Sequence, residues 1–156
     1  MKALLYSSIL AGVLASSGVL AAADSAPAEP RDPVLEKVSA ATARKDWAAA
    51  QAVLAPAVAA NPQNASYHNL YAYSIRKGAN PDMSLVFKHY NEALRIDPKH
   101  KGAHEYIGEA YLMIGNVGKA KEHLAQLDKL CFFSCSEFTD LKKSISEYEK
   151  TGTAKR

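Results

Sequence analysis

The stretch from Leu94 to Leu127 constrains the fold of this chain more than any other. It includes Asp97-Pro98, a small residue at Gly108 directly after an aliphatic one, and a Gly115-Asn116 pair, and it ends in a second apolar run. Gly-Asn pairs favour turns, and apolar residues three or four apart share one face of a helix. The pattern therefore predicts two helices joined by a tight turn, in an all-α fold.

Related patterns occur earlier in the chain, where Asn61-Pro62 matches Asp97-Pro98 and Lys45-Asp46-Trp47 forms a turn. We expect helix pairs at about residues 31–64, 65–100 and 101–134, within a domain over 33–150. Pro56 lies inside an expected helix and predicts a kink or a shifted start, because proline removes an intrahelical hydrogen bond. Asp32 is expected to cap the first helix.

An apolar stripe follows the third pair and predicts a capping helix over residues 137–149. Its members are Phe138, Leu141, Ile145 and Tyr148. Ser136 is expected to cap this helix, and residues 151–156 are expected to form a disordered tail. A helical array needs such a cap, because the last pair would otherwise leave apolar surface in water.

The helix pairs resemble tetratricopeptide repeats, which are units of ~34 residues. The resemblance covers about Arg31 to Leu130 and implies a short α-solenoid of about three repeats with a C-terminal capping helix. From Lys101 onward, and including Cys131 to Cys135, the chain is also similar to small exported tetratricopeptide proteins of proteobacteria. The resemblance implies a protein interaction scaffold with no enzymatic activity.

In this family the first helix of each repeat lines a concave groove, so the resemblance also implies groove residues. They are Asn69, Tyr73, Arg76, Lys77, Glu105, Glu109, Leu112 and Met113. Basic and amide side chains opposite acidic ones suit an extended peptide or a partner helix. The alternative is that Arg76 and Lys77 only pair with Glu105 and Glu109. Tyr73 distinguishes the two, since an aromatic side chain without a packing role would be a partner anchor.

The N-terminus has the features of a signal peptide over residues 1–23. A short positive start precedes an apolar run, and Ala21-Ala22-Ala23 supplies a cleavage site. We expect export to the periplasm of a bacterium, an extended proline-rich leader over residues 24–32, and no stable membrane insertion after cleavage. A retained membrane anchor is the alternative, although several Ser and Gly residues make the run a poor span.

The two cysteines, Cys131 and Cys135, are expected to form a local disulfide in an oxidising compartment. A Cys/His-based copper carrier or redox carrier is the alternative function, because the chain also has five histidines, which are His68, His89, His100, His104 and His123. His68 and His104 share a repeat position that normally packs between helices. We therefore expect packing histidines and no metal site.

Other function classes find no support in the sequence. There is no Gly-rich phosphate loop, no serine in a nucleophile-elbow context and no evident pair of catalytic carboxylates. We expect no enzymatic activity and no cofactor. A formal net charge of +3, with the charges scattered, argues against a nucleic-acid partner. Self-association through the N-terminal face of the array is a further alternative.

Overall fold

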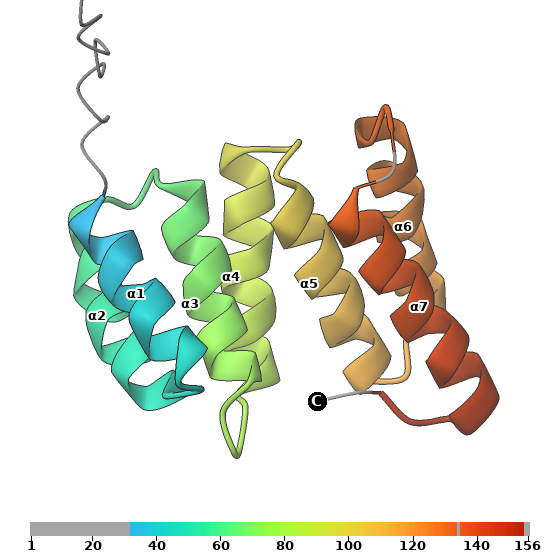
Figure 1. Cartoon of the computed structure of the whole chain (residues 1–156), viewed down its shortest axis with the longest axis horizontal. Helices are drawn as coiled ribbons and strands as arrows, with labels where there is room; N and C mark the ends of the chain where they lie inside the picture. The colour runs from blue at the N-terminus through green and yellow to red at the C-terminus, as the bar shows by residue number, and fades with distance from the viewer. Residues whose placement is uncertain (1–31, 134, 155–156) are drawn as a thin grey trace, which may run out of the picture. The chain divides into compact units, whose positions relative to one another are not determined.

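The computed structural model of the chain describes residues 32–133 and 135–154. These residues form seven α-helices and no strand (Figure 1). The helices are α1 (Pro33–Ala43), α2 (Trp47–Ala60), α3 (Ala65–Arg76), α4 (Met83–Ile96), α5 (Lys101–Met113), α6 (Val117–Leu130) and α7 (Ser136–Thr151). The all-α prediction is confirmed. The expected signal peptide, the leader up to residue 31 and residues 155–156 of the expected tail lie outside the described residues.

The helices form three antiparallel pairs and a final single helix, in a repeat-like arrangement. In Figure 1 they follow one another in chain order from α1 to the pair α5 and α6, with α7 beside α5. The first helices of successive pairs also contact one another, α1 with α3 and α3 with α5, and α7 continues this series by packing on α5. Among the described helices, none is long and apolar enough to cross a bilayer.

Side chains at the helix starts explain where most of the helices begin. Six N-cap side chains accept a hydrogen bond from a backbone N–H of the first turn: Asp32, Asp46, Asn64, Asp82, His100 and Asn116. The expected cap at Asp32 is confirmed. The expected cap at Ser136 is wrong, because Cys135 is the N-cap residue of α7 and the Ser136 hydroxyl donates to Glu137 instead.

Two of the three turns between paired helices contain a residue in the left-handed backbone conformation. Gly115 has a φ of 76° between α5 and α6, where glycine adopts this region without a steric penalty. Lys45 takes the same role between α1 and α2 with a φ of 57°. Pro56 does not shift the start of α2, which runs unbroken from Trp47. The proline is exposed, so the carbonyl group that loses its intrahelical partner lies on the solvent side.

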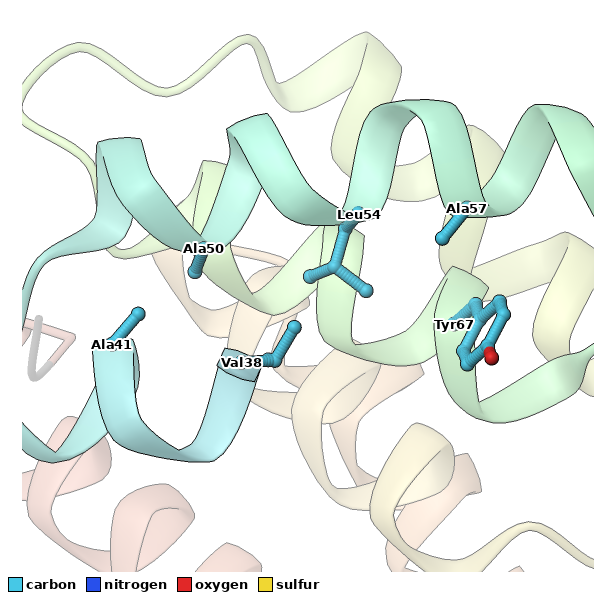
Figure 2. Packing of buried hydrophobic residues seen from close by; sticks show 6 residues of the cluster. All are labelled: Val38, Ala41, Ala50, Leu54, Ala57 and Tyr67. Carbon is cyan, nitrogen blue, oxygen red and sulfur yellow. The ribbon is translucent and has the colours of Figure 1, made fainter. Parts of the chain in front are cut away.

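Small side chains let the paired helices approach closely. In the first pair, Val38 and Ala41 of α1 face Ala50, Leu54 and Ala57 of α2, as Figure 2 shows. Tyr67 of α3 closes this cluster and donates a hydrogen bond from its hydroxyl to Asp32 Oδ2 at 2.6 Å. The first pair is thereby tied to the second.

The contact between α5 and α7 is closer than a larger side chain would permit. A Cβ atom at Gly108 of α5 would lie 2.6 Å from Cδ2 of Leu141 on α7. Leu141 and Ile145 join Leu112, Ala120 and Leu127 in the third core cluster. The expected capping helix therefore does cover the last pair, and its close docking brings its polar side chains next to α5.

Candidate functional site

The structure separates the eight side chains that were expected to line one groove. Tyr73, Lys77, Glu105 and Glu109 line a single pocket together. Asn69 instead lines a pocket between α1 and α3, and Leu112 and Met113 lie beside the end of α7. Arg76 is in none of these pockets.

Half of the eight expected groove residues do not lie at the surface. Asn69, Arg76, Glu105 and Leu112 are buried. The physical reason is the neighbouring helices, because residues that face away from the partner helix of their own pair are covered by the helices of the next pair or by α7. Leu112, for example, packs in the cluster with Leu141 and Ile145 of α7.

Arg76 is the centre of a buried polar network that joins four helices. Its side chain is 1% exposed, and its Nη2 donates to Glu109 Oε2 at 2.7 Å. Its Nε donates to the hydroxyl of Tyr90 on α4 at 3.3 Å. The other carboxylate oxygen of Glu109 accepts from Ser144 of α7 at 3.1 Å. The expected alternative, an ion pair across the helices, is confirmed for Arg76 and Glu109.

The protonation states of this network follow from its burial. Burial opposes the charge on Arg76, but the Tyr90 hydroxyl and the Glu109 carboxylate outweigh it, so the pKa of Arg76 is raised. Burial also raises the pKa of Tyr90. Arg76 is therefore a cation and Tyr90 a neutral hydroxyl at any physiological pH, and the network is structural.

The pocket in front of this network lies between α3, α5 and α7 and has a volume of about 270 Å³. Its lining residues are Tyr73, Lys77, Glu105, Tyr106, Glu109, Asp140, Lys143, Ser144 and Glu147. Four of them carry carboxyl groups and two carry ammonium groups. We call this site the Glu105 pocket.

Glu105 carries the most buried carboxyl group of this pocket. It is 9% exposed, and within the described residues it makes no hydrogen bond and no ion pair. Burial, together with the smaller effects of the nearby carboxylates of Glu109 and Asp140, raises the pKa of its carboxyl group to about 8. A buried carboxyl group without a partner favours the arrival of a donor or a cation.

Two tyrosine rings form the apolar wall of the Glu105 pocket. The centroids of Tyr73 and Tyr106 are 4.6 Å apart. Tyr73 also packs edge to face against Trp47 at 5.7 Å, so it has a packing role and is not a free anchor. Lys77 Nζ lies 6.0 Å from the Tyr73 ring centroid. Tyrosine faces attract cations, and here they flank a carboxyl group.

Sequence reasoning missed the part of the pocket that α7 contributes. Asp140, Lys143, Ser144 and Glu147 belong to the polar side of an amphipathic helix, which is normally its solvated side. Asp140, Lys143 and Glu147 lie three and four residues apart and therefore share one face of the helix. This spacing is the sequence signal that could have predicted a charged wall of the pocket. Only the docking of α7 on Gly108 turns that face toward α5.

The predicted disulfide between Cys131 and Cys135 is present, with Cα atoms 5.7 Å apart. It joins the end of α6 to the start of α7 across the interruption between the two helices. Both cysteines of the chain are in this bond, so no free thiol is available to a carrier that uses cysteine.

Four of the five histidines lie in two facing pairs, and His100 is the N-cap residue of α5. In the part of the chain that the structure describes, no three residues among His, Cys, Asp and Glu converge on one point. No protein-family model matches the chain, and a search of curated proteins finds no match either.

Proposed function

We propose that the chain is a short α-solenoid of about three tetratricopeptide repeats that binds a peptide segment of another protein. Three successive helix pairs of similar length support the repeat assignment. So do the small residues at matching buried positions, such as Ala50 and Ala120, each 0% exposed. An exported location, with an envelope protein as partner, remains part of the proposal and is supported by the composition of residues 1–23 and by the disulfide.

The chemistry of the Glu105 pocket specifies which segment the scaffold would bind. Arg76 is paired with Glu109, and Glu105 makes no ion pair with any residue that the structure describes. A lysine or arginine side chain of the partner fits this need: its charged end pairs with Glu105, and its methylene groups pack on Tyr73 and Tyr106. The observation that carries the proposal is that Glu105 is only 9% exposed and that its carboxyl group makes no hydrogen bond or ion pair within the described residues.

The expected result is that labelled extended peptides with one central lysine or arginine bind, while matched peptides with norleucine at that position bind about tenfold less tightly or worse. Fluorescence anisotropy with the full-length chain measures both affinities. Affinity for the lysine peptide should increase as the pH rises from about 6 to about 8.5, because a carboxyl group with a pKa of about 8 ionises in that range while lysine stays charged.

Two variants locate the effect. Glu105→Gln keeps the shape of the side chain and should abolish both the preference for lysine and the pH dependence. Glu149 lies on α7, which also lines the pocket, but it pairs with Lys121 outside the pocket. Glu149→Gln should therefore change neither the preference for lysine nor the pH dependence. Equal binding of the lysine and norleucine peptides, or unchanged preference in Glu105→Gln, would refute the proposed function.

A further inference from the structure

Two histidine pairs with the same geometry lie in successive helix pairs. His68 of α3 faces His89 of α4 with Nδ1 atoms 2.8 Å apart, and His104 of α5 faces His123 of α6 with Nδ1 atoms 2.9 Å apart. The Nε2 atom of each first histidine contacts a backbone carbonyl six residues earlier, Pro62 at 3.1 Å and Pro98 at 3.0 Å. The same arrangement of two histidines and a backbone carbonyl thus occurs twice in the fold.

The rings of each pair meet end to end. The ring centroids are 5.1 Å apart in the first pair and 5.2 Å in the second. In each pair, the distance between ring centroids is longer than the distance between the two Nδ1 atoms. The difference is about twice the radius of an imidazole ring. The two Nδ1 atoms therefore lie close to the line that joins the ring centres, with their in-plane orbitals directed at each other.

The contacts also determine which nitrogens carry protons. A carbonyl oxygen can only accept, so Nε2 of His68 and of His104 carries the proton, and Nδ1 of each neutral ring has a free lone pair. The Nδ1 atom of the opposite ring must then donate. Within the described residues, neither His89 nor His123 has a hydrogen-bond partner at Nε2. In each of these two rings the proton can therefore move from Nδ1 to Nε2. The two Nδ1 atoms of the pair would then face each other with a lone pair each.

From this geometry we infer that each histidine pair is a two-coordinate site for a soft monovalent metal ion, of the copper(I) and silver(I) class, bound between the two Nδ1 atoms. The ion enters as the monovalent cation, so no electron is transferred. The proton that leaves Nδ1 of the second histidine resides on Nε2 of the same ring, so no net proton is released. Imidazole is a good ligand for copper, and these ions accept linear coordination by two ligands.

The surroundings of the pairs support this assignment. In metal sites a ligating histidine usually donates its other N–H to a backbone carbonyl, as His68 and His104 do here. Bonds of about 2 Å to a central ion require the nitrogens to separate by about 1 Å, a change that side-chain rotation provides.

Each site also has groups that tolerate a buried positive charge. The ring of Tyr71 lies 4.8 Å from that of His89, and the ring of Tyr111 lies 5.7 Å from that of His123. Glu92 favours a positive charge at His89, whereas Lys88 opposes it. In the same way, Glu122 favours a positive charge at His123 and Lys119 opposes it. His89 lies three residues after the buried Val86, and His123 lies three residues after the buried Ala120. The corresponding position in the first helix pair, three residues after Ala50, is Val53, so that pair has no such site.

Native mass spectrometry of the full-length chain with silver nitrate, in chloride-free buffer at neutral pH, tests the inference. The wild-type chain should bind two silver ions, one for each pair. His89→Val and His123→Val should each bind one ion, and the double variant none. Valine is chosen because Val53 shows that it fits this position. His100→Asn is the control, since His100 caps α5 outside both pairs and should leave the count at two.

A second measurement needs no variant and so does not depend on variant folding. In histidine ¹H–¹⁵N spectra of the wild-type chain, silver should convert His89 and His123 from the Nδ1–H form to the Nε2–H form. Silver that leaves these tautomers unchanged, or a silver count that is the same in the double variant as in wild type, would overturn the inference.

Discussion

Replacing Arg76 with alanine is expected to lower the free energy of unfolding by about 3 to 5 kcal/mol. The substitution leaves Glu109 with only the Ser144 hydroxyl as partner and leaves the fully buried Tyr90 hydroxyl without one. It also removes the guanidinium group that lies 5.5 Å from the Tyr73 ring centroid and 5.8 Å from that of Tyr106. Equilibrium denaturation at neutral pH, with the slope checked for two-state behaviour, measures the loss.

Arg95→Ala is the matched control for this prediction. Arg95 also pairs with a glutamate at 2.7 Å, but its side chain is 57% exposed, and pairs of that kind contribute ~0 to 1 kcal/mol. The variant Arg76→Ala/Glu109→Gln should recover part of the loss, because it removes the charge that the single substitution leaves uncompensated. A loss below about 1 kcal/mol for Arg76→Ala would show that the network does not hold the four helices together.

The second large effect is expected at the docking of α7. Leu141→Ala should lower the free energy of unfolding by about 2 to 5 kcal/mol, the range for truncating a buried leucine. Leu141 is 0% exposed, and its side chain fills the space that Gly108 leaves on α5. Hydrogen exchange should also show that the amides of α7 lose protection more than those of α3 and α4 do. Thermal or chemical denaturation measures the global change.

A control and a double variant make this prediction specific. Ile114→Ala removes an apolar side chain that is 52% exposed and should cost well under the Leu141 value. Gly108→Ala introduces a methyl group against Leu141, and its effect should be smaller in the Leu141→Ala background, where the space is free. Equal effects of Gly108→Ala in both backgrounds would mean that α7 does not dock on Gly108.

Much of the fold could be predicted because its signals are local. Asp32, Gly115 and Asn116 act through hydrogen bonds and backbone angles within a few residues, and the structure uses them as expected. The bounds of α7 differ by only a residue or two from the expected helix, although the cap at Ser136 is wrong. Helix ends can be predicted from the sequence where the capping or turn residue lies within a few residues of the helix end.

The site was only half predictable, because burial depends on helices that are distant in sequence. Arg76 and Glu105 occupy positions that a single helix pair would leave facing outward, yet the adjoining helices bury both. Spacing alone could not show that Arg76 forms its ion pair with Glu109 and not with Glu105. Similarly, the sequence predicted that His68 packs between helices, whereas the close approach of its Nδ1 atom to that of His89 depends on how α3 and α4 are placed.

The titration of Glu105 itself tests most directly whether this residue is the binding group of a peptide scaffold. In the full-length chain with ¹³C-labelled glutamate, the Glu105 carboxyl resonance, assigned with Glu105→Gln, should titrate with a pKa of about 8. Saturation with the lysine peptide should lower that pKa, because a bound cation favours the ionised carboxylate. A carboxyl group that titrates near the ordinary value of 4.5, or whose pKa the peptide leaves unchanged, would contradict the proposed role.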